Sequence, residues 1–95
     1  MIALAGTLSV GPQDRALVES LLPDHIRLTR QEPGCRLFQV VADRCNPDQL
    51  LVAERFTDRA SFDAHQARTA HSAWGKATAH LTRCYQISEI ADPAS

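Results

Sequence analysis

Two histidines, His65 and His71, lie close together in the segment FDAHQARTAHSAW, which ends at Trp74. Imidazole exchanges a proton near neutral pH more readily than other side chains, so the pair suggests general-base chemistry or metal binding. On one continuous helix, residues six positions apart point about 120° away from each other. Two histidines that bind one metal from a helix are instead spaced by three or four residues, as in H-E-x-x-H. The spacing argues against a metal site.

Two of the four histidines have both a functional and a structural interpretation. His65 fits a general base that faces a pocket, and it equally fits a half-buried ring that donates to a backbone carbonyl. His25 fits a catalytic residue that assists His65, or a ring packed beside the leucines of its own helix. Surface or helix-end positions suit the remaining two, His71 and His80.

Other side chains could bind a small substrate. Phe62 and Trp74 could form the walls of an apolar pocket that excludes water, although core packing is the alternative for Trp74. Arg55 could pair with a carboxylate or phenolate, and Tyr85 could offer a hydroxyl group from the sheet. The chain contains no G-x-S-x-G, P-loop or G-x-G-x-x-G motif. Serine hydrolysis, phosphoryl transfer and dinucleotide binding therefore have no support.

Hydrophobic periodicity predicts the elements that position these side chains. Apolar runs bounded by turn residues predict four strands, over residues 2–10, 36–42, 50–56 and about 83–90. Helical spacing predicts three helical segments, over residues 13–31, 59–69 and 70–81. The order β-α-β-β-α-β, with the second helix in two pieces, predicts a ferredoxin-like α+β fold. Its four-stranded antiparallel sheet is covered by helices on one face.

Details within the helices are also predicted. In the first helix, Leu17, Leu21 and Leu28 form the expected buried stripe, and His25 falls on it. Pro23 is expected to kink or restart this helix. A break near Thr69 is expected to divide the second helix.

The two middle strands carry apolar residues on both faces. Leu37 and Val41 in one strand, and Leu51 and Ala53 in the next, alternate with other apolar residues. Helices cover only one face of such a sheet, and an exposed apolar face of several hundred Å² marks an interaction surface. We therefore expect a homodimer packed sheet to sheet.

Length and charge narrow the class of protein. The 95 residues predict one domain, with a core over residues 2–90 and a tail over residues 91–95. The net charge is −1, from 10 basic and 11 acidic residues without a basic stripe, which argues against a nucleic-acid partner. The apolar N-terminus lacks a basic leader, and no segment approaches the roughly 20 apolar residues of a membrane span. We expect a cytoplasmic protein with no membrane partner, whose cysteines, Cys35, Cys45 and Cys84, are reduced thiols.

Three segments together resemble the antibiotic biosynthesis monooxygenase (ABM) family. They are EPGC at residues 32–35, LLVAERF at residues 50–56 and FDAH at residues 62–65, and the resemblance extends over most of the chain. It implies a dimeric α+β barrel with a pocket between the sheet and the helices of each subunit. It also implies an oxygenase of quinol-like or polyketide aromatics that needs neither metal nor flavin. Other members of the wider superfamily degrade haem or isomerise small metabolites.

Single positions within these segments match the family, and positions elsewhere in the chain depart from it. Glu54 and Phe56 stand where the family has an acidic and an aromatic residue in its third strand, and residues 63–65 match its Asp-Ala-His. Residues 69–71 read Thr-Ala-His, where relatives commonly carry Pro-His-Phe. Gly6 replaces the pocket asparagine of the haem-degrading branch, which makes haem degradation a poor fit.

Three functions remain open. The first is a cofactor-independent monooxygenase in which His65, assisted by His25, removes a proton from a phenol or enol, so that the anion can reduce O2. The second is a non-catalytic dimeric module that binds a small hydrophobic or aromatic metabolite. The third is an isomerase that uses the same histidine without oxygen.

Overall fold

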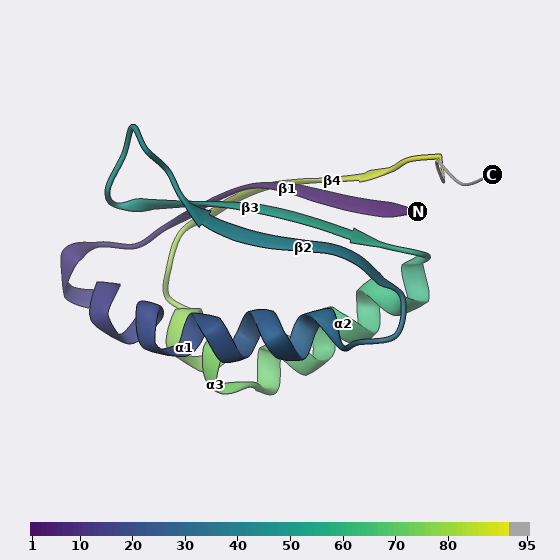
Figure 1. Cartoon of the computed structure of the whole chain (residues 1–95), viewed down its shortest axis with the longest axis horizontal. Helices are drawn as coiled ribbons and strands as arrows, with labels where there is room; N and C mark the ends of the chain where they lie inside the picture. The colour runs from purple at the N-terminus through teal and green to yellow at the C-terminus, as the bar shows by residue number, and fades with distance from the viewer. Residues whose placement is uncertain (92–95) are drawn as a thin grey trace.

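A four-stranded antiparallel sheet, with three helices packed on one of its faces, makes up the computed structural model, which describes residues 1–91 (Figure 1). The strands are β1 (Ile2–Ser9), β2 (Cys35–Ala42), β3 (Gln49–Phe56) and β4 (Arg83–Glu89), in the spatial order β2-β3-β1-β4. The helices are α1 (Pro12–Arg30), α2 (Arg59–His71) and α3 (Ala73–Thr78). The predicted ferredoxin-like α+β fold is confirmed. Apart from residue 91, the predicted tail lies outside the described residues.

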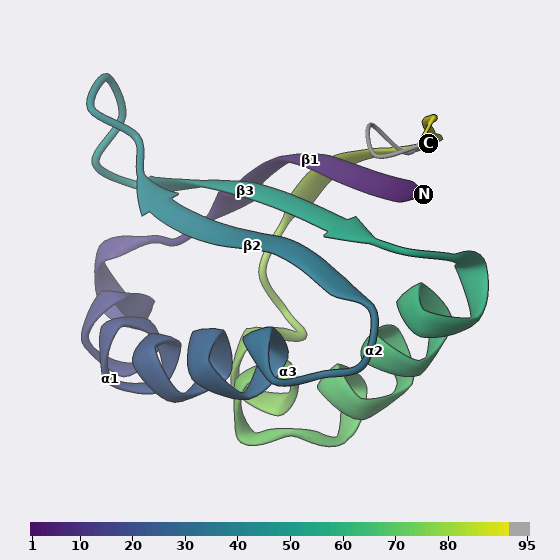
Figure 2. The ribbon, with the colours of Figure 1, turned by 45° about the vertical axis from the view of Figure 1, so that its right-hand side comes forward.

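The core lies between the sheet and the helices, and strand alternation determines which side chains enter it. In β1, Ile2, Leu4 and Leu8 are buried, whereas Ala5 and Ser9 are exposed, because successive residues of a strand point to opposite faces. Figure 2 shows all three helices on the same side of the sheet, with the opposite side uncovered. None of the helices that the structure describes is long and apolar enough to cross a lipid bilayer.

Helix α1 runs without interruption through Pro23, so the predicted restart does not occur. A proline leaves the carbonyl four residues earlier, here that of Glu19, without its helical donor. Pro23 and Glu19 are both exposed, so water can satisfy that carbonyl and the helix continues.

The buried side of α1 differs from the predicted stripe. Val18, His25 and Thr29 are its buried residues, whereas Leu17 and Leu28 are 52% and 41% exposed. The prediction that these two leucines are buried is therefore wrong. Val18, His25 and Thr29 follow one another at intervals of seven and four residues, which is also helical spacing. His25 belongs to both rows, and this places its ring at the edge between the core and the leucine row.

Serine 72 separates α2 from α3, three residues beyond the predicted break. Its backbone is extended, and its Oγ accepts a hydrogen bond from the Gly75 N–H at 3.0 Å and donates to the Thr69 carbonyl at 2.7 Å. This is an N-cap, a position that favours serine. A Cβ at Gly75 would collide with the Thr69 carbonyl, so the close approach of the two helices requires glycine there.

Apolar side chains remain exposed on the uncovered face of the sheet. Leu51 in β3 pairs with Val41 in β2, and the two side chains are 41% and 53% exposed. We propose that two copies of the chain pair through this face, which would remove these side chains from water.

The proposed pairing predicts that Leu51→Lys yields a monomer where the wild-type protein is a dimer, as measured by sedimentation velocity. Two buried ammonium groups without partners would oppose association. Leu17→Lys, on the exposed side of α1, is the matched control and should leave the dimer intact. A wild-type protein that sediments as a monomer would contradict the pairing.

Candidate functional site

A small cavity of about 60 Å³ lies between the sheet and the helices. Its polar lining residues are His25, Glu54, His65, Gln66, Thr69, Arg83 and Tyr85. Its apolar lining residues are Phe38, Val40, Val52 and Trp74. The lining comes from all three helices and from strands β2, β3 and β4, so only the folded chain assembles it.

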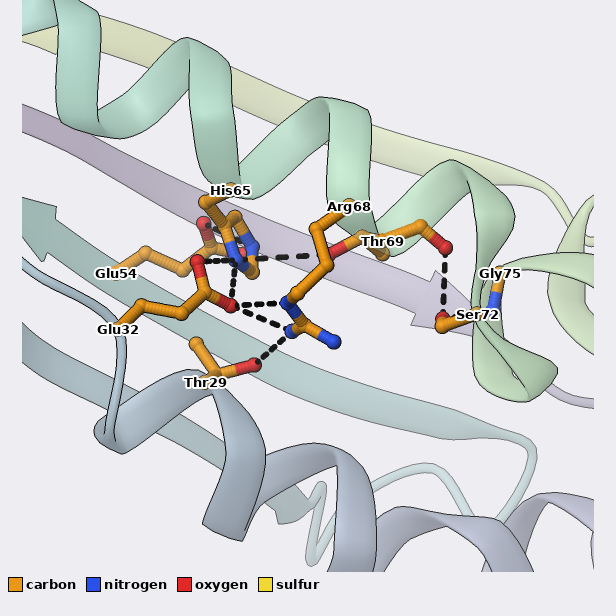
Figure 3. A network of polar contacts seen from close by, with 8 residues as sticks. All are labelled: Thr29, Glu32, Glu54, His65, Arg68, Thr69, Ser72 and Gly75. Carbon is orange, nitrogen blue, oxygen red and sulfur yellow. Dashed lines mark hydrogen bonds and ion pairs between the residues drawn. The ribbon is translucent and has the colours of Figure 1, made fainter.

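His65 is oriented by Glu32. The His65 side chain is 1% exposed, and its Nδ1 lies 3.1 Å and 3.2 Å from the two Glu32 carboxylate oxygens (Figure 3). A carboxylate only accepts hydrogen bonds, so Nδ1 carries the proton and Nε2 keeps a free lone pair. Nε2 lies 3.5 Å from Glu54 Oε1, without hydrogen-bond alignment. His65 is therefore a neutral base with its lone pair on the side of Glu54.

Arg68 holds the Glu32 carboxylate in place and is itself held by Thr29. Arg68 Nε donates to Glu32 Oε1 at 2.7 Å, and Arg68 Nη2 donates to Thr29 Oγ1 at 3.1 Å. His65 and Arg68 are three residues apart on α2, so both side chains reach the same carboxylate. This network of Thr29, Glu32, His65 and Arg68 links the end of α1 to α2 (Figure 3).

Burial shifts the proton affinity of the groups around the cavity. It lowers the pKa of His65, although the hydrogen bond that His65 donates to Glu32 acts in the opposite direction. It lowers the pKa of His25 to about 4, with contributions from His65 and Arg68. For Glu54, burial together with the charge of Glu32 raises the pKa to about 7. At neutral pH both imidazoles are therefore neutral, and Glu54 is close to half protonated.

Two buried polar atoms of this cavity have no hydrogen-bond partner in the described part of the chain. They are Nδ1 of His25 and Oε1 of Glu54. Leaving such an atom unsatisfied costs about 1–3 kcal/mol. The His25 ring stacks on Trp74, with centroids 4.8 Å apart and planes inclined by 7°. A ligand with polar atoms would satisfy both groups.

Among residues 1–91, no three or more His, Cys, Asp or Glu side chains are placed to hold a metal ion.

Four of the residues selected from the sequence meet at this cavity, namely His25, His65, Trp74 and Tyr85. Burial is the main reason that the Tyr85 hydroxyl has a raised pKa, so it remains a neutral donor. The two histidines that sequence analysis placed at the surface are indeed exposed. They are His71, at the end of α2, and His80, whose Nε2 contacts Asp14 Oδ1 at 3.1 Å.

The other two selected residues do not line the cavity. Phe62 is buried and packs edge-on against Phe56, with ring centroids 5.9 Å apart. Arg55 is exposed and pairs with Ala3 on the uncovered face of the sheet. Because Arg55 alternates with Glu54 along β3, its side chain lies on the opposite side of the sheet from the cavity.

Sequence analysis did not select Glu32 or Arg68, and it treated Glu54 only as a family marker. Glu54 carried a usable signal, since it stands between Val52 and Phe56 on the helix-facing side of an apolar strand. A carboxylate at a core position is rarely structural alone. The contact between Glu32 and Arg68 joins residues 36 positions apart, and no local spacing indicates it.

Comparison with known proteins identifies a family and many similar folds. The sequence model of the family described as "Antibiotic biosynthesis monooxygenase" matches residues 1–77. A candidate antibiotic biosynthesis monooxygenase from Deinococcus radiodurans superposes with a TM-score of 0.77 at 23% identity, over 97% of this chain and 94% of the other. The corresponding candidate from Nitrosomonas europaea superposes with a TM-score of 0.78 at 18% identity, over 94% of this chain and 97% of the other.

A third structure, Rv0793 from Mycobacterium tuberculosis, gives a TM-score of 0.75 at 23% identity, over 99% of this chain and 98% of the other. At these identities the likeness shows a shared fold and leaves the substrate undetermined. No curated protein matches the chain.

Removing the Glu32 carboxylate should change the titration of His65. In Glu32→Gln we expect the pKa of His65 to fall below its wild-type value, because the carboxylate charge and its hydrogen bond both raise that pKa. Histidine ring resonances followed by NMR across pH would measure this. Asp63→Asn, at an exposed position of α2, is the control and should change little. A His65 pKa that stays the same or rises in Glu32→Gln would refute the orienting role.

The buried carboxyl of Glu54 should make stability depend on pH. Its pKa of about 7 in the folded protein exceeds the ordinary 4.5, so the folded state holds a proton that the unfolded chain releases between these values. Stability from this group is therefore lost as the pH rises through that window. The unfolding free energy of Glu54→Gln, taken relative to that of wild type, should therefore be about 2–3 kcal/mol higher at about pH 8 than at about pH 5.

Urea denaturation at the two pH values would measure the difference, with Glu19→Gln at an exposed position of α1 as the control. The other titrating groups, including His25, are common to wild type and variant and cancel in the comparison. Parallel pH dependence of wild type and Glu54→Gln would show that Glu54 titrates normally.

Proposed function

The chain belongs to the antibiotic biosynthesis monooxygenase family, and on that premise we propose that it oxidises an electron-rich phenol, quinol or enol with O2, without a cofactor. One observation carries the proposal. It is the buried imidazole of His65, whose Nδ1 is held by Glu32 and whose Nε2 is free on the cavity side. This is the arrangement of an oriented general base.

Proton removal is the first step. Nε2 of His65 takes the proton of the substrate hydroxyl, and the imidazolium that forms is stabilised by Glu32, which Arg68 keeps in place. A positioned base of this kind contributes about 10²–10⁴-fold in rate. Neutral His65 is the competent form, and burial keeps its pKa below 6.5. The rate should therefore rise with pH through that pKa and level off above it.

The anion then reacts with O2. It transfers one electron to O2, and the resulting radical and superoxide combine to form a carbon–oxygen bond. The proton on His65 returns to the peroxide. For a reacting carbon that carries one hydrogen in the phenol or enol form, loss of that hydrogen as a proton with cleavage of the O–O bond gives a carbonyl group and water. One O2 is consumed, and all the electrons come from the substrate. The apolar walls, formed by Phe38, Val40 and Trp74 among others, exclude water from the intermediates.

The size of the cavity constrains this proposal. Its volume of about 60 Å³ is well below the roughly 300–1,000 Å³ of typical ligand sites. An aromatic substrate therefore requires the cavity to widen. Helix α3, which carries Trp74, has only six residues and packs mainly against α1 and α2. It is the element of the wall that can shift with the least disturbance of the sheet.

A second candidate function is isomerisation by proton transfer without oxygen. Glu54, with a pKa near 7, and the free Nε2 of His65 lie 3.5 Å apart beside the same cavity. One group could remove a proton from carbon while the other protonates a carbonyl oxygen, which is the requirement for enolisation. A non-catalytic module that binds a hydrophobic metabolite uses the same cavity without turnover.

Oxygen consumption by the purified protein would distinguish these functions. With a panel of quinols and anthrones, we expect wild type to consume O2 and His65→Ala to be slower by about 10²–10⁴-fold. His71→Ala, an exposed histidine on the same helix, is the matched control and should retain full activity.

Each alternative has its own outcome in the same experiment. Product that forms equally well under anaerobic conditions would favour the isomerase. A rise in melting temperature on adding a compound that is never converted would favour the binding module. If no compound in the panel is oxidised faster than by His65→Ala, the oxygenase proposal is wrong.

A further inference from the structure

A groove of about 130 Å³ lies on the outer side of the candidate site, where α1 faces the start of α3. Its lining residues are Leu21, Asp24, His25, Leu28, Arg68, Ser72, Ala73 and Trp74. Two of these, His25 and Trp74, also line the inner cavity. Their rings are stacked nearly parallel, 4.8 Å apart. The stacked pair therefore forms a wall with the cavity on one side and the groove on the other.

The groove presents apolar surface to the solvent. Leu28 is 41% exposed and Leu21 is partly buried, because α1 turns its Val18–His25–Thr29 row to the core and leaves its leucine row at the edge. The charged groups here already have partners. Arg68 binds Glu32 and Thr29, and Asp24 Oδ1 lies 3.3 Å from Arg27. The groove therefore suits an uncharged apolar group better than an anion or a cation.

We propose that this groove is an outer subsite that binds an apolar substituent of the substrate, while the hydroxyl-bearing ring lies beside His65 in the cavity. The inference rests on the proposed function for the position of the ring. It assigns the substrate to a class, namely elongated, uncharged phenols or enols with an alkyl or aryl arm. It also explains how a site with so small an inner cavity accepts an aromatic molecule, since displacement of the His25–Trp74 wall joins the cavity to the groove.

The buried Nδ1 of His25, which has no partner, supports the same arrangement. It belongs to the dividing wall, so a ligand that passes from groove to cavity runs alongside it. A polar atom between the ring and the arm of the substrate could bind this nitrogen. His25, neutral because burial lowers its pKa to about 4, can donate or accept there, depending on its tautomer.

Fluorescence of Trp74 provides the test, because it is the only tryptophan of the chain and its ring borders both spaces. We would titrate the full-length protein with 4-methylphenol and with 4-hexylphenol. Each buried methylene group strengthens binding by up to about fourfold. If the groove takes two to three of them, 4-hexylphenol should bind about 30-fold more tightly than 4-methylphenol.

Matched variants locate the effect on the surface. Leu28→Gln places an amide in the groove and should remove most of the preference for the hexyl compound, while 4-methylphenol binds as before. Leu17→Gln makes the same change on the same helix outside the groove, and it should keep the wild-type preference. Both leucines are largely exposed, so both variants should fold.

Equal affinities of wild type for the two phenols, or identical behaviour of the two variants, would overturn the outer subsite. So would the absence of any Trp74 response to either compound. The proposed function alone fails if the hexyl preference depends on Leu28 as expected but no phenol or quinol is oxidised. The groove then stands as part of a binding site.

Discussion

The hydrogen bond between His65 Nδ1 and the Glu32 carboxylate determines the chemistry that this fold can support. It selects one tautomer of a buried imidazole and leaves the other nitrogen as a base on the cavity side. Arg68 donates to the same carboxylate and is itself held by Thr29. Because Glu32 lies in the turn after α1 and His65 on α2, this one contact also joins the two helical segments over the sheet.

Around this contact the chain retains polar groups that a purely structural core would avoid. Glu54 faces the cavity from β3 and His25 from α1, each with an unsatisfied atom. Their burial disfavours the charged forms and produces two neutral imidazoles beside a carboxyl that titrates near pH 7. Such a set of groups costs stability, and it would suit the proton transfer that the proposed function requires.

Sequence reasoning succeeded where one short segment decides the outcome. Alternation in β1 and the helical spacing of α2 depend on neighbouring residues, and the fold class followed from the order of the elements. It failed on α1, where two rows of apolar residues compete. The row that contains Leu17 and Leu28 and the row that contains Val18 and Thr29 both have helical spacing. Only contact with the sheet decides which row is buried. The boundary at Ser72 was missed because its cap depends on Gly75 approaching Thr69.

The sequence by itself determined the β-α-β-β-α-β order and the family resemblance, and it singled out His65 as a candidate base, because periodicity and motif spacing are local properties. Only the tertiary structure placed Glu32 against His65 and Glu54 beside its free nitrogen, and put Arg55 on the far face of the sheet. These placements depend on strand register and on how helices cross the sheet. Both arise from contacts between residues far apart in the chain, which no local pattern encodes.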